Sequence, residues 1–200
     1  LPPAYRQIVA EAQEEFKSTG DPQLIDLVID RGMYDYLYTN ARVDFLRGYF
    51  LRLIDLTNIK TAMRLKRSRA GVIRWAFLPH GSVDPRLLLE AVREPWDAFG
   101  PKFAATDYAA VVEEGLRQLE AKGTLTDYEC LVDEYLLAYL RLCVNPRDGI
   151  ALSRIINKPA RGIGGKSLAQ IFAEAVRQQV SIWDVMLRAR QKDCPLEIST

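Results

Sequence analysis

The residues with the clearest chemical potential form a glycine-rich run late in the chain, Arg161-Gly162-Ile163-Gly164-Gly165-Lys166-Ser167. A Gly-x-Gly turn between two helices lets the backbone bend tightly and point its amides outward, and amides at a helix N-terminus bind phosphate. Arg161 and Lys166 flank the turn with positive charge. The run therefore predicts a phosphate-contacting turn. The alternative is a glycine turn that only caps two packed helices.

The same run satisfies the loosest form of the nucleotide-binding P-loop, with Ala160 in first position and Gly165-Lys166-Ser167 at the end. A P-loop follows a buried β-strand and needs an acidic strand end elsewhere for magnesium. The upstream residues 155–159 are too few for such a strand and include Pro159, and no apolar strand ending in Asp is found in the sequence. We therefore reject ATP hydrolysis and expect no cofactor and no small-molecule substrate.

Asp55 and Asn58 also stand out, because they lie one helical turn apart in a stretch dense with apolar residues. Arg64 and Lys66 follow them. Acid–base catalysis by Asp55 would call for a second converging carboxylate, and none occurs at helical spacing. We interpret the four residues as a structural polar network, in which Asp55 bonds an arginine or caps a neighbouring segment.

Histidine and cysteine give no sign of a catalytic or metal site. The only histidine, His80, lies in a Pro-His-Gly turn without an orienting partner at a local spacing, which is typical of a surface turn. Cys130, Cys143 and Cys194 lack metal-ligand spacing. Their odd number and wide separation favour a reducing compartment, so we expect a cytoplasmic protein without a bound metal.

Helical periodicity runs along almost the whole chain and predicts an all-α fold, a bundle or array of about eight to ten helices. Its most regular part is residues 40–67, with an apolar stripe at Phe45, Tyr49, Leu53, Leu56, Ile59 and Met63. Capping boxes are predicted at Thr126-x-x-Glu129 and Ser181-x-x-Asp184. Residues 72–78 are apolar enough for a strand but lack a partner run, so we expect a packed loop. The last helices should form a C-terminal hairpin with the Gly-x-Gly turn.

Composition and charge describe a globular protein with two unlike parts. Hydrophobic residues make up 48% and charged residues 26%, as in ordinary globular domains. No apolar run reaches the roughly 18 residues that cross a bilayer, so no transmembrane segment is expected. Residues 1–140 carry a net charge of −4, whereas ten Lys/Arg against three acids give residues 141–192 a net charge of +7. Such a change suggests two segments with different partners.

An ordered series in the first part resembles the C-type subunit of V/A-type rotary ATPases, which is the d-type subunit of the eukaryotic enzymes. The matching places are Tyr49-Phe50, Leu53, Asp55, Asn58-Ile59, Arg64 and Lys66, with Glu129-x-x-x-Asp133-x-Tyr135-Leu136 further on. The resemblance covers about residues 1–140. It implies a wholly helical, funnel-like protein that sits on the membrane rotor ring and receives the central stalk, on the cytoplasmic face of a membrane complex. That role is mechanical and has no catalytic residue.

The second part resembles UvrD-like superfamily 1 DNA helicases, in the region entering their accessory DNA-contacting subdomain. The match is dense from Ala138 to Leu168 and extends over about residues 138–187. It implies that Arg161, the glycines and Lys166 contact the DNA backbone, which positions a protein without reading base sequence. The ATP site of that family lies outside this region.

The sequence thus predicts two domains, residues 1–140 and 141–200, that resemble different families. Three functional hypotheses follow. The chain is a non-catalytic rotary-ATPase scaffold, a DNA-backbone-binding helicase fragment, or a chimeric or engineered helical protein with neither activity. The first hypothesis is preferred because its resemblance covers the larger part of the chain.

Overall fold

The structure, a computed structural model, describes residues 2–68, 76–145, 147–156 and 163–190. Every regular element in these residues is an α-helix, which confirms the predicted all-α class. Packing divides the chain into two compact units, Leu1–Thr106 and Asp107–Thr200. This division lies before the boundary at residue 140 that charge and resemblance predict. The ten helices of the described residues are α1 Pro3–Thr19, α2 Gln23–Asn40, α3 Asp44–Ser68, α4 Pro85–Arg93, α5 Trp96–Lys102, α6 Ala109–Lys122, α7 Thr126–Val144, α8 Gly149–Ile155, α9 Gly165–Gln178 and α10 Ile182–Arg190.

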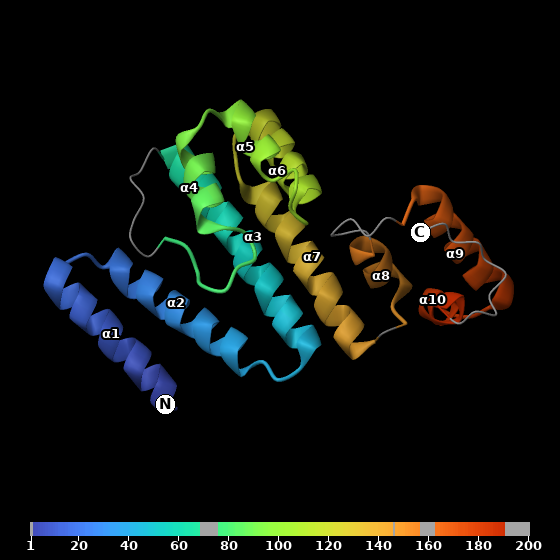
Figure 1. Cartoon of the computed structure of the whole chain (residues 1–200), viewed down its shortest axis with the longest axis horizontal. Helices are drawn as coiled ribbons and strands as arrows, with labels where there is room; N and C mark the ends of the chain where they lie inside the picture. Colours follow the sequence, from blue (N-terminus) through green and yellow to red (C-terminus); the bar gives the residue numbers. More distant parts are fainter. Residues whose placement is uncertain (1, 69–75, 146, 157–162, 191–200) are drawn as a thin grey trace. The chain divides into compact units, whose positions relative to one another are not determined.

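In the first unit, α1 and α2 lie side by side and are joined by a tight turn (Figure 1). Gly20 ends α1 in the left-handed conformation, with a φ of 71°, which glycine adopts without strain. Asp21 then accepts a hydrogen bond from the Gln23 amide at 2.9 Å, next to Pro22 at the N-cap of α2. The two helices approach closely at Gly32, where a Cβ atom would lie 2.6 Å from Cγ1 of Ile8.

The long helix α3 confirms the most regular stretch of the sequence, although it begins at Asp44 and not at residue 40. Its fully buried face runs from Ile54 to Met63. Phe45, the first member of the predicted apolar stripe, is 40% exposed, so the stripe is buried only along its later part. Burial of this face anchors α3 in the core of the first unit.

The helix α5 was not predicted from the sequence. It has seven residues, contains Pro101 and is too short for a helical repeat to show. Aromatic packing holds it in place: the ring centroid of Phe99 lies 5.7 Å from that of Trp96 and 5.1 Å from that of Phe103. Its neighbour α4 begins at an N-cap, Asp84, which accepts a hydrogen bond from the Arg86 amide at 2.8 Å.

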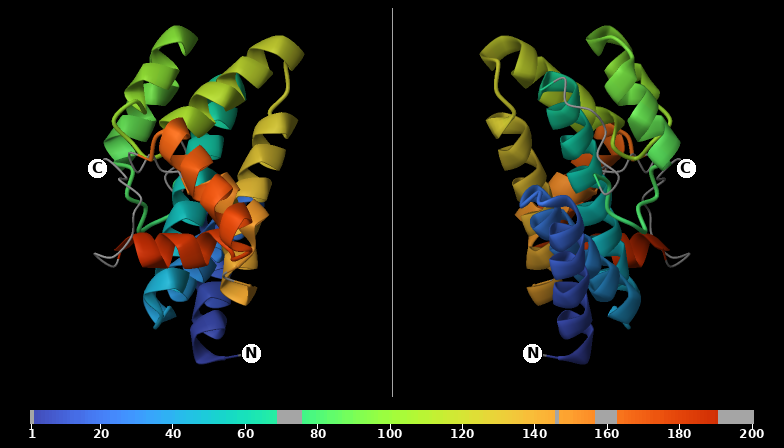
Figure 2. Two further views of the ribbon diagram at one scale, coloured as in Figure 1. Left: turned by 90° about the vertical axis from the view of Figure 1, so that its right-hand side faces the viewer. Right: turned by 90° about the vertical axis from the view of Figure 1, so that its left-hand side faces the viewer.

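In the second unit, α6 and α7 are joined by a short turn in which Gly123 has a φ of 69° (Figure 2). They pack closely at Gly115, where a Cβ atom would collide with the ring of Tyr128. The capping box predicted at Thr126 is wrong, because Leu125 occupies the N-cap and no side chain caps α7 there. α7 continues without a break through residue 140, the predicted domain boundary.

A separate apolar core joins the last three helices, formed by Leu152, Ile156, Ile171, Ala175, Ile182 and Val185. The capping box at Ser181 is confirmed. Ser181 Oγ donates to Asp184 Oδ2 at 2.7 Å, and it accepts from the Asp184 amide at 3.1 Å. Together the core and the cap fix α10 against α9.

Candidate functional site

The polar side chains of Asp55 and Asn58 are buried, with 0% and 2% of their surface exposed. Asn58 Nδ2 donates to the carbonyl oxygen of Leu78 at 3.0 Å, and Asn58 Oδ1 accepts from the Leu78 amide at 2.7 Å. Asp55 accepts from Ser82 Oγ at 2.6 Å and from the Val83 amide at 3.1 Å. One turn of α3 thereby holds the loop that follows it.

The same loop comes closest to α3 at Gly81. A Cβ atom on this residue would lie 2.6 Å from Oδ1 of Asp55, so a larger side chain would displace the carboxylate from its donors. The preceding residue, His80, has a φ of 68°, which few non-glycine residues adopt. The loop is therefore shaped to bring its backbone within reach of Asp55 and Asn58.

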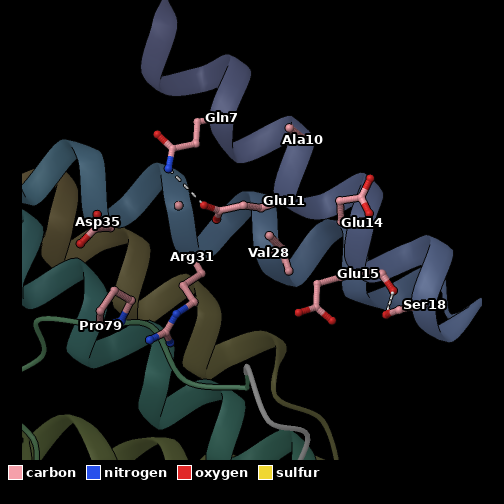
Figure 3. A pocket seen from close by; sticks show the side chains of 11 residues that line it. Gln7, Ala10, Glu11, Glu14, Glu15, Ser18, Val28, Arg31, Asp35 and Pro79 are labelled. Atoms are coloured by element: carbon pink, nitrogen blue, oxygen red, sulfur yellow. Dashed lines mark hydrogen bonds between the residues drawn. The ribbon is translucent and has the colours of Figure 1, made fainter.

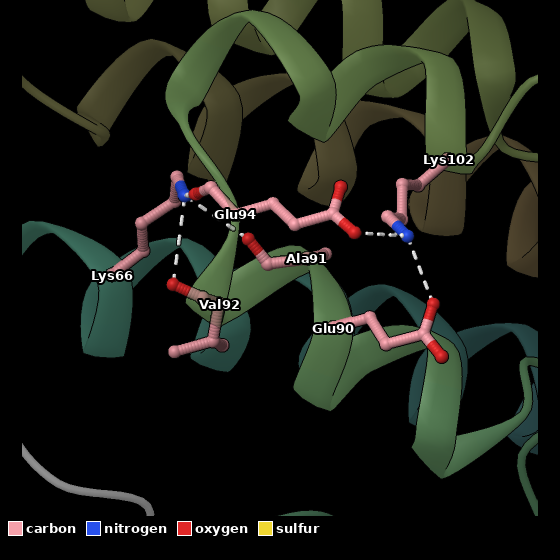
Figure 4. A network of polar contacts seen from close by, with 6 residues as sticks. All are labelled: Lys66, Glu90, Ala91, Val92, Glu94 and Lys102. Atoms are coloured by element: carbon pink, nitrogen blue, oxygen red, sulfur yellow. Dashed lines mark hydrogen bonds and ion pairs between the residues drawn. The ribbon is translucent and has the colours of Figure 1, made fainter.

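Lys66 connects α3 to the end of α4 (Figure 4). Its ammonium donates to the carbonyl oxygen of Ala91 at 3.1 Å and to the carbonyl oxygen of Glu94. It also lies 5.1 Å from the ring centroid of Trp96. Burial lowers the pKa of Lys66, although the negative charges of Glu94 and Asp97 oppose this effect. A cation at the C-terminal end of a helix satisfies carbonyls that have no partner within it.

Lys102 forms a second polar link across α4 and α5. Its ammonium lies 2.8 Å from Oε2 of Glu90 and 2.7 Å from Oε1 of Glu94. Hydrogen bonding to these two carboxylates raises the pKa of Lys102. Glu94 therefore takes part in both links, with its backbone on Lys66 and its side chain on Lys102 (Figure 4).

The four residues proposed as one network thus lie in different surroundings. Asp55 and Asn58 bind the loop at residues 78–83, and Lys66 binds the turn between α4 and α5. Arg64 lies on the exposed side of α3. The sequence marked the right turn of helix, but the residues that bind Asp55 and Asn58 lie at least 20 residues further along the chain.

His80 has a partner that sequence reasoning missed. Its Nε2 lies 2.5 Å from Oδ1 of Asp35, and its ring stacks on Tyr38 with centroids 4.7 Å apart. Arg31 adds a third link from α2, donating to the carbonyl oxygen of Phe77 at 2.7 Å. A sequence separation of 45 residues hides the His80–Asp35 pair, and no local spacing could have revealed it.

A groove of about 830 Å³ lies between α1 and α2 (Figure 3). Its walls carry Glu11, Glu14 and Glu15 from α1 and Arg31 and Asp35 from α2. Acidic residues alone do not make a metal centre. In the part of the chain that the structure describes, no group of three or more His, Cys, Asp or Glu could hold a metal ion.

The glycine-rich run is only partly described: Arg161 and Gly162 lie outside the described residues. Ile163 packs against the apolar core of the second unit. Gly164 is the N-cap of α9 in an ordinary extended conformation, φ −63° and ψ 157°, and no side chain of the described residues caps the helix. A Cβ atom at Gly164 or Gly165 would meet nothing within 4 Å, so the described packing does not require glycine there.

The first turn of α9 contains Lys166 and Ser167. Lys166 is exposed and Ser167 is half-buried. The amides of a first helical turn have no partner inside the helix, and no side chain in the described part of the chain caps them here. Before the run, the described residues form helix α8 and not the β-strand that a P-loop follows.

Among the helices of the described residues, none is both long and apolar enough to cross a bilayer.

Two family models match the chain. One, described as "ATP synthase (C/AC39) subunit", matches residues 3–145. The other, described as "UvrD-like helicase C-terminal domain", matches residues 133–194. The two matches overlap along α7, the helix in which the sequence resemblance changes.

The curated relatives match the later part of the chain. The ATP-dependent DNA helicase PcrA of Staphylococcus epidermidis is 45% identical over 51 residues, which are 26% of this chain and 7% of the helicase. The DNA helicase II of Rickettsia typhi is 42% identical over 59 residues, which are 30% of this chain and 9% of that protein. The chain thus spans less than a tenth of these relatives. No solved structure matches significantly.

Proposed function

Because the chain belongs to the ATP synthase (C/AC39) subunit family, we propose that it is a non-catalytic component that joins the central stalk of a V/A-type rotary ATPase to the membrane rotor ring. The match over residues 3–145 carries the proposal. The site of action would be the cytoplasmic face of a membrane complex. The remaining segment, from residue 141, would be a part of different ancestry, related to UvrD-like helicases.

The polar contacts of the first unit support a mechanical role. Asn58 and Asp55 use their hydrogen bonds to bind the loop to α3, and Lys66 binds the α4–α5 turn to the same helix. Each of these contacts joins two segments of the protein itself. A long helix braced at several points is suited to transmitting force, because bending it would break buried hydrogen bonds.

An exposed apolar cluster at the start of α3 is the surface that we expect to bind a partner. Val43, Phe45 and Leu46 are exposed by 56%, 40% and 38%. Grouped apolar side chains at a surface favour protein–protein contact. They also belong to the stretch that carries the rotary-ATPase resemblance.

Biolayer interferometry would measure the binding of the full chain to purified rotor ring and to purified central stalk. We expect binding to at least one, displaced by an excess of the rotary ATPase's own stalk-to-ring coupling protein. Phe45→Glu should weaken it. Phe16→Glu is the matched control, because Phe16 is also 40% exposed but lies on α1. If the chain binds neither partner, the proposed function is refuted. If Phe45→Glu and Phe16→Glu bind equally well, only the assignment of the binding surface to Val43, Phe45 and Leu46 is rejected.

DNA-backbone binding is the second candidate, favoured by the first turn of α9, which no described side chain caps, and by the net charge of +7 over residues 141–192. It predicts salt-sensitive, sequence-independent binding of duplex or junction DNA. Gly164→Asp provides a sharp test. The extended backbone at Gly164 suits an aspartate N-cap, so the variant should fold while a carboxylate occupies the place of a phosphate.

Fluorescence anisotropy at several salt concentrations would compare Gly164→Asp and Lys166→Glu with the unchanged chain. Lys17→Glu, at an exposed site on α1, makes the same charge reversal as Lys166→Glu and serves as the control. Loss of affinity in the two α9 variants but not in the control would support phosphate contact there. Unchanged affinity in all three would exclude it.

A further inference from the structure

α7 buries one face and exposes the opposite face. Tyr135, Leu136 and Tyr139 belong to the buried core. At 100° per residue, positions 137, 140 and 144 lie on the other side of the helix. Large apolar side chains occupy all three and are exposed: Leu137 by 50%, Leu140 by 37% and Val144 by 89%.

Charges of opposite sign lie on the two sides of Leu137 along the helix. Asp133 and Glu134 are exposed one turn before Leu137, and Arg141 is exposed one turn after it. Asp133 lies within the angular range of the stripe, whereas Arg141 and Glu134 border it, about 40° and about 60° from Leu137. The face therefore changes from acidic to basic along the helix, with Leu137 at its midpoint.

We propose that this face of α7 is an interface between two copies of the chain, with the helices antiparallel across a two-fold axis at Leu137. In this arrangement Leu137 meets its own symmetry mate. Asp133 lies opposite the partner's Arg141, and the symmetry repeats this ion pair on the other side. Apolar contact is centred on the two-fold axis, where Leu140 packs diagonally against Leu137 of the partner subunit and also lies opposite the partner's Glu134.

The sign of the charges decides the orientation. Parallel helices across a two-fold axis would bring each acidic end beside the other and each arginine beside its copy, which is repulsive. The antiparallel arrangement instead brings each Asp133 beside the partner's Arg141, which is attractive. It also places the helix macrodipoles in opposite directions.

The exposed stripe is short, so the dimer is expected to be weak. One helix face with three large apolar residues buries less surface than a stable interface, which covers about 800 Å² per partner. We expect a dissociation constant on the order of 100 µM. Association would then occur where copies are concentrated locally.

Sedimentation velocity over a range of concentrations tests the proposal on the full chain. Asp133→Arg and Arg141→Asp should each weaken dimerisation by about tenfold or more, because every ion pair becomes a like-charge pair. The double variant, Asp133→Arg with Arg141→Asp, should restore the affinity of the unchanged chain. This rescue is specific to an antiparallel pair.

Leu137→Glu places two carboxylates at the two-fold axis and should abolish association. Val176→Glu is its matched control, because Val176 is 77% exposed on α9 and lies outside the stripe. Thermal unfolding by circular dichroism confirms that each variant is folded. The proposal would be overturned if the chain stays monomeric at about 500 µM, or if the single charge reversals leave the affinity of the dimer unchanged.

Discussion

Asn58 pairs with the backbone of Leu78 through both ends of its side-chain amide. Nδ2 donates to the Leu78 carbonyl oxygen at 3.0 Å, and Oδ1 accepts from the Leu78 amide at 2.7 Å. A backbone segment normally finds such paired partners in another backbone, so this asparagine replaces a neighbouring strand. The loop after α3 depends on it for its position.

Replacing Asn58 by Asp should therefore destabilise the protein by about 2–4 kcal/mol. The change removes the donor to Leu78 and adds a second buried carboxylate one turn from Asp55. Urea unfolding measures the loss. Gln13→Glu, the same kind of change at an exposed position of α1, should stay within about 0.5 kcal/mol. Equal effects of the two substitutions would contradict the role of Asn58.

Replacing Lys66 by Met should loosen the turn between α4 and α5. Methionine keeps the apolar stem beside Trp96 but removes the donor to the carbonyls of Ala91 and Glu94, at a cost of about 1–2 kcal/mol. Amide hydrogen exchange over residues 85–102 should accelerate. Arg67→Met, at an exposed position of the same helix, is the control and should leave exchange there unchanged.

Tyr128→Phe should stabilise the second unit. In the described part of the chain, the Tyr128 hydroxyl is the one buried side-chain polar atom without a hydrogen-bond partner. Burial also raises the pKa of this phenol. Removing the hydroxyl should raise the free energy of unfolding by about 1–2 kcal/mol.

The control for Tyr128 is Tyr139→Phe, because the Tyr139 hydroxyl lies 3.3 Å from that of Tyr135 and has a partner to lose. That variant should be no more stable than the unchanged chain. Chemical denaturation would measure the free energy of unfolding of both variants. A loss of stability in Tyr128→Phe would show that the Tyr128 hydroxyl has a hydrogen-bond partner.

Protonation of Asp184 at low pH should destabilise the start of α10. Hydrogen bonding from Ser181 holds the pKa of Asp184 below its ordinary value of 3.8. The folded pKa is lower than the unfolded pKa, so this contribution to stability is present above pH 3.8 and is lost as the pH falls through the folded value.

Urea midpoints measured at decreasing pH would show this dependence. Asp184→Asn should show a weaker dependence of stability on pH. This variant should also be less stable than the unchanged chain at neutral pH. Ser181→Ala should act in the same direction by removing the donor. Identical pH profiles for Asp184→Asn and the unchanged chain would refute the linkage.

Local patterns in the sequence determined the helical class, most helix positions and several helix ends. The Ser181–Asp184 box, the Gly123 C-cap and the Asp84 N-cap are each formed by residues within a few positions of one another. Such features depend on short-range sterics and hydrogen bonding, so they can be inferred before any tertiary contact is known. Thr126 shows the limit, because its pattern fits a cap that the fold does not use.

Tertiary structure alone decided which polar residues meet. His80 lies against Asp35, Asn58 against Leu78, and Lys66 against the end of α4. The sequence marked Asn58 and Lys66 as unusual, but their partners lie 20 to 28 residues further along the chain. These pairings follow from how α2, α3, α4 and the loop pack. Packing depends on the burial of whole helix faces, and no short spacing encodes it.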